Sequence, residues 1–131
     1  MATSEAFSEI CRRVCEEQGW KLDPAGVHVP LPHDRHQVVS LEFFQHEREE
    51  RIRLLTTIGG TNDLTPVRLT IALRINFELA HGAFAVKDDN LILMDTLMLE
   101  SVGSEELELS IRFLAETADY YEKAIFDTDE N

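Results

Sequence analysis

The sequence predicts an α+β fold in which helices pack on an antiparallel sheet, in the order α-β-β-β-α-β-β-α. Three segments carry apolar residues at the helical spacing of three and four, and five shorter segments alternate as strands do. Turn-forming residues separate successive strands, which favours hairpins over the long crossovers that parallel strands need.

The first element is a helix predicted over Ser4–Gln18. Its apolar face consists of Phe7, Ile10, Cys11 and Val14. Gly19 is typical of the residue that ends a helix, because glycine enters the left-handed conformation without steric cost. Trp20 is expected to fold back over this helix end.

Three strands are predicted next, over residues 26–31, 38–46 and 50–58. Pro30 lies in the first of them and lacks the N–H group that a central strand donates, which predicts an edge position. The charged residues 47–49 form the turn between the second and third strands. The segment Gly59–Asp63 is expected to be a flexible loop that leads into the central helix.

The stretch from Thr65 to Leu99 organises the rest of the chain. Thr65 is suited to cap a helix, and Pro66 to its first turn, where a missing N–H group costs nothing. The helix carries two apolar stripes where a surface helix needs one. The first stripe is Val67, Ile71 and Ile75, and the second is Leu69, Ala72, Leu73 and Phe77. Two stripes predict burial on two sides, one of them against a partner.

A hairpin follows this helix, with strands over 83–86 and 91–99 and a turn at 87–90. The second strand is apolar on both faces, whereas an outer strand of a lone small domain usually alternates. One face carries Leu91, Leu93, Leu97 and Leu99, and the other carries Ile92, Met94 and Met98. This excess apolar surface predicts a partner, most simply a second copy of the chain.

The last helix is predicted to begin at Ser104, with Glu105 and Glu106 in its first turn, where the helix dipole favours acids. Its apolar stripe covers about five turns. The stripe consists of Leu107, Ile111, Leu114, Ala118, Tyr121 and Ile125.

Length and charge restrict the class of protein. A chain of 131 residues suits a single domain over residues 1–131. The formal net charge of −13 argues against binding nucleic acid or anionic membranes, and residues 101–131 hold nine of the 25 acids against two bases. No run approaches the roughly 20 apolar residues of a membrane span, and the acidic N-terminus is unlike a secretory signal. We therefore expect a cytoplasmic protein.

The candidates for chemistry are few, and we expect no enzyme, no metal and no cofactor. Cys11 and Cys15 share a helix face and are expected to be buried free thiols. Imidazole and carboxylate groups of the kind that bind zinc or nickel occur near one strand end. Their spacing does not match the helical HExxH pattern, and they are expected to be ordinary loop residues. They are His28, His33, His36 and Asp34.

Two further features of the sequence also have both a functional and a structural interpretation. Gly59-Gly60-Thr61 precedes a helix as a phosphate-binding loop does, but the lysine of that motif is missing and the surroundings are acidic. Arg74 and Asn76 are polar residues within the doubly apolar helix. They either set the register at an interface or mark the solvent edge of the helix.

The element order, the small size and the low pI resemble the class I type III secretion chaperones, the CesT/Tir-chaperone group. The segment 54–100 is more specifically similar to the bacterial YbjN group, as is the upstream segment 27–43. The matching positions are Leu73, Asn76, Phe77, Leu79, Gly82, Phe84, Ala85, Leu91, Leu93, Thr96, Leu97, Leu99 and Glu100. The resemblance implies a homodimer built on the central helix and the hairpin after it. In the secretion chaperones, the dimer holds an extended client segment without ATP or covalent chemistry.

We therefore expect a non-catalytic, chaperone-like homodimer that binds an extended segment of a client protein, by strand addition and apolar pockets. The expected client-binding residues are Val27, Val29, Leu31, Val38 and Phe44. The expected dimer interface consists of Leu69, Leu73, Asn76, Phe77, Ile92, Met94 and Met98. The alternative is a YbjN-type regulatory dimer whose acidic face binds a basic protein partner.

Overall fold

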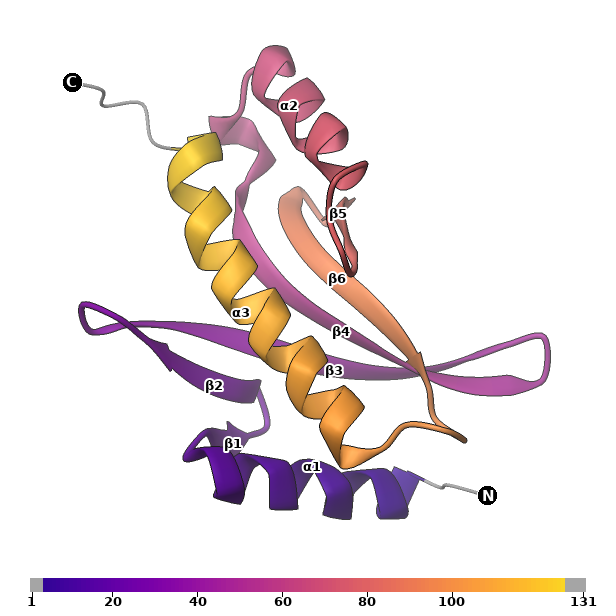
Figure 1. Ribbon diagram of the computed structural model, residues 1–131. Coiled ribbons are helices and arrows are strands. Elements are labelled where there is room, and N and C mark those ends of the chain that lie inside the picture. Colours follow the sequence, from indigo (N-terminus) through magenta and orange to yellow (C-terminus); the bar gives the residue numbers. More distant parts are fainter. Residues whose placement is uncertain (1–3, 127–131) are drawn as a thin grey trace.

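The computed structural model describes residues 4–126 and confirms the predicted α+β class (Figure 1). The helices are α1 (Ser4–Gln18), α2 (Pro66–Asn76) and α3 (Ser104–Phe126), with a 3₁₀ turn η1 (Thr61–Asp63). The strands are β1 (Lys21–Asp23), β2 (Gly26–Leu31), β3 (Arg35–His46), β4 (Glu49–Gly60), β5 (Ala83–Lys87) and β6 (Asn90–Met98). None of the helices in this described part combines the length and apolar character needed to cross a bilayer.

The sheet contains one strand more than the sequence predicted, because β1 has only three residues and shows no recognisable alternation. Its order is β1-β2-β3-β4-β6-β5, and every neighbouring pair is antiparallel. The expected loop at Gly59–Asp63 is also absent. The two glycines extend β4, and η1 contains the next three residues.

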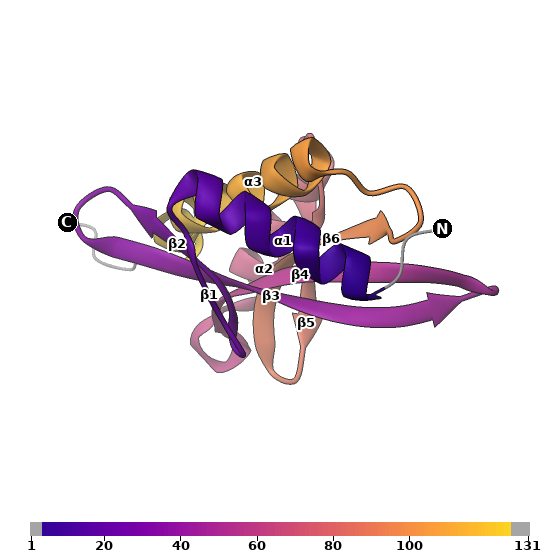
Figure 2. The same cartoon turned by 90° about the horizontal axis from the view of Figure 1, so that it is seen from below.

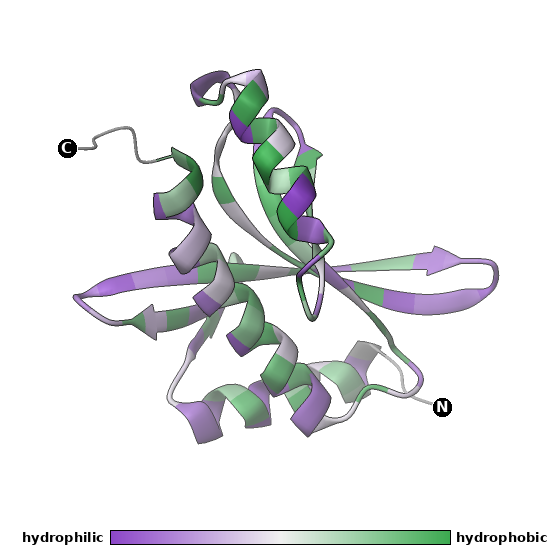
Figure 3. Cartoon of the chain, turned by 45° about the horizontal axis from the view of Figure 1, so that its top comes forward, coloured by the Kyte–Doolittle hydropathy of each residue, from purple (hydrophilic) through white to green (hydrophobic). Residues whose placement is uncertain are grey.

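Strand β3 changes partner along its length. Its residues 35–39 pair with β2, whereas residues 40–46 pair with β4. The β2–β3 and β3–β4 hairpins therefore extend to opposite sides of the molecule (Figure 1). Both hairpin ends are hydrophilic (Figure 3). Where β3 leaves β4, the Gln37 amide donates to Thr56 Oγ1 and the Thr56 hydroxyl donates to the Val38 carbonyl, so side chains replace missing ladder bonds.

The predicted edge position of β2 is corrected, because β1 lies outside it. However, β1 pairs only with residues 26–28, so residues 29–31 have no strand on that side within the described chain. Pro30 lies in this unpaired part of β2, and its missing N–H group therefore costs no ladder bond to β1.

Helices α1 and α3 pack on one face of the sheet, and α3 crosses β2, β3, β4 and β6 (Figures 1 and 2). The predicted stripe of α3 is buried, apart from Tyr121, which is half-buried against the core. Asp95 lies on the covered face of β6. It accepts a hydrogen bond of 2.8 Å from the buried Ser110 hydroxyl of α3, which partly satisfies the carboxylate.

The end of α1 confirms the predictions for Gly19 and Trp20. Gly19 has a φ of +76°, and the Trp20 amide donates to the Cys15 carbonyl at 2.9 Å, as in a Schellman motif. Arg112 of α3 lies over the Trp20 ring and donates to the Gln18 side chain, which fixes this helix end against α3. Cys11 and Cys15 are buried free thiols, as predicted. The hydrogen bond to Cys15, and then burial, raise the pKa of Cys11 above its ordinary value, which favours the protonated thiol.

Candidate protein-binding surfaces

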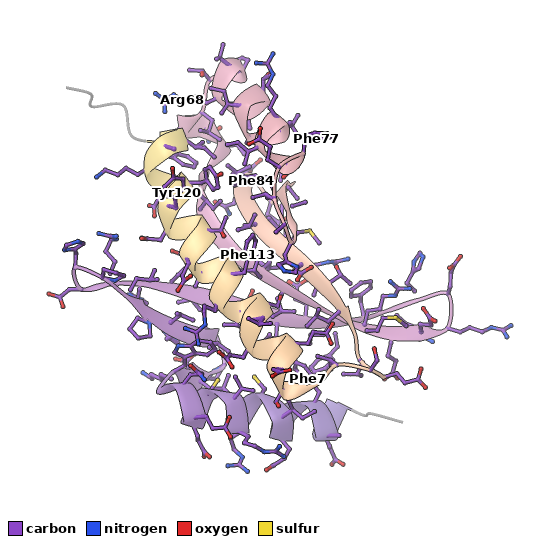
Figure 4. All side chains as sticks on the ribbon, viewed as in Figure 1. Phe7, Arg68, Phe77, Phe84, Phe113 and Tyr120 are labelled. Atoms are coloured by element: carbon purple, nitrogen blue, oxygen red, sulfur yellow. The ribbon has the colours of Figure 1, made fainter. Side chains whose placement is uncertain are left out.

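Helix α2 is attached to the rest of the chain at its two ends. At its start, the Thr65 hydroxyl caps the helix by accepting from the Arg68 amide at 3.2 Å, as predicted. The Arg68 guanidinium donates to the Ile125 carbonyl, beside the C-terminal end of α3 (Figure 4). A cation suits that position because the helix dipole is negative there.

At the other end of α2, the Asn76 side chain bonds the backbone of the outermost strand. Its Oδ1 accepts from the Phe84 amide at 2.6 Å, and its Nδ2 donates to the Phe84 carbonyl at 3.3 Å. One side chain thus satisfies both backbone groups of a residue on β5, an edge strand, as a neighbouring strand would. Asn76 therefore has a role within its own chain, and its place at a dimer interface stays a prediction.

The remaining surface of α2 is open, and apolar side chains lie on either side of the exposed polar residues Thr70 and Arg74. Only Ala72 is buried, and hydrophobic residues occur all along the helix (Figure 3). Phe77, which caps the helix end, is 95% exposed and points away from the molecule (Figure 4), and Leu73 is 67% exposed. Val67 and Ile71 are exposed as well. We call Val67, Ile71, Leu73 and Phe77 the outer surface of α2.

The other residues expected at a dimer interface differ in exposure. Leu69 and Met94 are half-buried, and Met98 is exposed. Ile92 lies between core residues of β6, so its side chain points to the face of the sheet opposite α3. It is buried on that face as well and offers no free surface.

A groove of about 640 Å³ lies between the β2–β3 hairpin and the C-terminal half of α3. An adjoining hollow of about 430 Å³ continues it along α3. The groove is lined by Pro30, Leu31, Pro32, Arg35, Glu116, Asp119, Tyr120, Lys123 and Ala124. It lies beside the part of β2 that has no outer neighbour in the described chain.

An ion pair holds the two walls of this groove together. Arg35 Nε donates to Asp119 Oδ1 and Arg35 Nη2 to Asp119 Oδ2, both at 2.8 Å, in a bidentate arrangement. The Asp119 side chain is only 16% exposed, whereas half of Arg35 faces solvent. The hydrogen bond from Arg35 holds the pKa of Asp119 below its ordinary value, so the carboxyl stays ionised.

The five residues expected to bind a client lie in four places. Val27 and Val29 belong to the hydrophobic core, because they face α3 rather than the open side, and this corrects their assignment as surface residues. Leu31 lines the groove. Val38 lines a separate hollow of about 400 Å³, and Phe44 a hollow of about 300 Å³. Arg53 lies 4.1 Å above the Phe44 ring.

The histidines form pairs with their neighbours. His28 Nε2 is 2.9 Å from Asp23 Oδ2, and the His28 ring stacks on His36. His33 and Asp34 occupy the two positive-φ positions at the hairpin tip. No group of three or more His, Cys, Asp or Glu side chains suited to a metal ion occurs among residues 4–126.

Sequence reasoning missed the groove because its walls are far apart in the chain. Arg35 and Asp119 are 84 positions apart, and no local pattern indicates that they meet. Tyr120 is 70% exposed and lies on the outer side of α3 (Figure 4), beside the predicted stripe rather than in it. An exposed aromatic residue next to that stripe was the one available signal.

Comparison with known proteins identifies the fold. No family model and no curated protein matches the sequence. Solved structures do match. The chain aligns with a structure of the ExsC–ExsE complex at a TM-score of 0.69 and 14% identity, covering 98% of this chain and all of that one. The HopA1–SchA chaperone–effector complex gives 0.60 and 10%, covering 89% and 93%.

A third match is the type III secretion chaperone SycH from Yersinia pestis, in complex with a fragment of YscM2. Its TM-score is 0.56 at 18% identity, covering 87% of this chain and 98% of that one. The likeness to YbjN from E. coli is lower, with a TM-score of 0.48. The chain therefore has the type III secretion chaperone-like fold that the resemblance predicted.

Proposed function

We propose that this protein is a non-catalytic, chaperone-like cytoplasmic homodimer that holds an extended segment of a client protein. The observation that carries the proposal is the outer surface of α2, whose side chains lie outside the core of their own chain. Burying one large apolar side chain contributes about 1.5–3 kcal/mol, so a partner that covers these four would stabilise the assembly.

A second copy is the simplest occupant of the outer surface of α2. The two helices can pair about a two-fold axis, since such an interface brings the same surface of each protomer together. Asn76 and Arg68 fix α2 to β5 and α3, so the helix presents its apolar side chains on a rigid support. Half-buried Leu69 and Met94 and exposed Met98 remain proposed as interface residues.

The client is proposed to bind at the groove between the β2–β3 hairpin and α3. Residues 29–31 of β2 have no outer strand in the described chain, and an extended peptide could bond to such an edge while its side chains enter the groove. The likeness to HopA1–SchA and to SycH supports this proposal, because both structures are complexes of a chaperone with another protein. Leu31 is the proposed contact here, and Val38 and Phe44 are proposed secondary contacts on the other face.

Light scattering at micromolar concentration tests the dimer. The wild-type mass should be twice the 15.0 kDa of the chain. The double variant Leu73→Ser/Phe77→Ser should give the mass of one chain. Leu109→Ser is the matched control, because Leu109 is also exposed but lies on α3, outside the outer surface of α2. A wild-type protein of monomer mass would contradict the proposal.

Fluorescence anisotropy tests client binding, with a labelled, carboxymethylated unfolded polypeptide as the probe. Leu31→Ser should weaken binding severalfold, whereas Leu109→Ser should leave it unchanged. Binding that is equal for wild type and Leu31→Ser would place the client elsewhere. No binding by wild type would refute client binding itself.

The second candidate is a regulatory dimer whose acidic face binds a basic protein. The observation in its favour is α3, which carries six acidic and two basic residues. Salt separates the candidates, because charge pairing between exposed groups is screened at high ionic strength and apolar contact is not. Binding that disappears completely at 1 M salt would favour the regulatory dimer.

A further inference from the structure

The groove beside Arg35 has apolar walls on both sides. Pro30, Leu31 and Pro32 form the hairpin wall, and Tyr120 and Ala124 form much of the helix wall. Such walls suit the methylene stem of a long side chain. The exposed ring of Tyr120 also offers an aromatic face, which attracts a cation placed over it.

The two cations and two anions that line the groove balance, and the surroundings of the groove are negative. Arg35 and Lys123 are the cations that line the groove, and the Arg35 guanidinium is engaged by both oxygens of Asp119. Glu116 lies one helical turn before Tyr120 on the same face of α3 and lines the groove. Glu122 lines the adjoining hollow. Lys123 is the cation of the lining that would repel a basic side chain in the groove. The C-terminal end of α3 is also near, and there Arg68 already donates to the Ile125 carbonyl.

We propose that the groove takes an arginine or lysine side chain of an extended polypeptide in which basic and apolar residues alternate. The stem lies between Leu31 and Tyr120, and the cationic end lies near Glu116. This inference rests on the proposed client-binding function and names the chemistry of the client. An acidic segment would instead meet like charge along α3, and the chain as a whole carries −13.

Two fluorescein-labelled peptides test the inference by anisotropy at low salt. Both are 14 residues long and unstructured, with valine alternating with arginine in one and with glutamate in the other. Wild-type protein should bind the arginine peptide at least tenfold more tightly. Glu116→Gln and Tyr120→Ala should each weaken that binding roughly threefold to tenfold, as expected for one partly exposed charge or ring contact.

Glu106→Gln is the matched control. It makes the same change of charge at an exposed position in the first turn of α3, outside the groove, and should alter binding less than twofold. If Glu106→Gln weakens binding as much as Glu116→Gln does, recognition depends on overall charge and the groove is not the site. If the glutamate peptide binds as tightly as the arginine peptide, the inference is wrong while client binding stands. If neither peptide nor an unfolded polypeptide binds, the proposed function fails as well.

Discussion

At the scale of single residues, the close approach of two backbone segments depends on Gly82. Its φ is +69°, and a Cβ atom built there would lie 2.4 Å from the Met94 carbonyl oxygen. That contact is with backbone, which cannot rotate away. Gly60 is different, because a Cβ at that position would make only ordinary contacts, the nearest at 3.7 Å.

Gly82→Ala should therefore lower the free energy of unfolding by at least about 2 kcal/mol, through left-handed strain and the clash together. Gly60→Ala should change it by less than about 0.5 kcal/mol, or stabilise slightly by restricting the unfolded chain. Urea denaturation monitored by Trp20 fluorescence measures both. Equal effects of the two substitutions would contradict the argument from the Met94 carbonyl.

The Arg35–Asp119 pair makes stability depend on pH. The pKa of Asp119 is lowered by the hydrogen bond from Arg35, so the folded state binds this proton less readily than the unfolded chain. The stabilisation is present above the ordinary value of 3.8 and is lost as pH falls through the lower pKa of the folded state. Asp119→Asn cannot ionise, so it lacks this contribution at every pH.

The expected result is that wild type is more stable than Asp119→Asn at pH 6, and that this advantage shrinks as pH falls below 3.8. Urea titrations of both proteins between pH 6 and pH 3 measure the difference. Glu106→Gln serves as the comparison for a carboxyl outside this ion pair. If the stability advantage of wild type over Asp119→Asn grows on acidification, the pKa of Asp119 is raised in the folded state and the argument is wrong.

At the scale of elements, Asn76 connects α2 to the edge of the sheet. Removing its side chain leaves the Phe84 amide and carbonyl without their partner. Asn76→Ala should cost about 1–3 kcal/mol, the usual penalty for partly buried polar groups that lose a hydrogen bond. Asn76→Asp keeps the acceptor for the Phe84 amide, but it places an anionic oxygen opposite the Phe84 carbonyl at the C-terminal end of α2, so it should be destabilising as well.

Hydrogen exchange of the Phe84 amide reports this contact directly. Protection of that amide should fall in Asn76→Ala and remain in Asn76→Asp, because Oδ1 is the atom that accepts from it. Exchange at Leu93 in the neighbouring strand should change little. If protection of the Phe84 amide is unchanged in Asn76→Ala, other groups must accept a hydrogen bond from it at the edge of β5.

The elements differ in how far the sequence alone predicts them. The long periodic helices were predictable, because their apolar spacing reflects packing on one face. The burial of Val27 and Val29 was not predictable, because alternation shows that two faces of a strand differ and does not show which of them a helix will cover. The groove could not be predicted from the sequence, because it depends on contacts between residues far apart in the chain.

At the scale of the whole molecule, the proposed dimer would make α2 a link between folding and association. Its outer surface contributes nothing to the core of its own chain, so the proposed second copy would add stability that a lone chain lacks. The stability of a dimer that unfolds to two separate chains rises with concentration by mass action. A tenfold increase favours the folded dimer by about 1.4 kcal/mol.

The melting temperature of wild type should therefore rise steadily when the protein is concentrated from 1 to 100 µM. Leu73→Ser/Phe77→Ser should melt at a temperature that does not depend on concentration, because it replaces the exposed side chains that the proposed interface buries. Leu109→Ser should behave as wild type does. Calorimetry at several concentrations measures all three. A wild-type melting temperature that is independent of concentration, for a protein of dimer mass, would mean that the two copies separate before they unfold and that α2 needs no partner to stay folded.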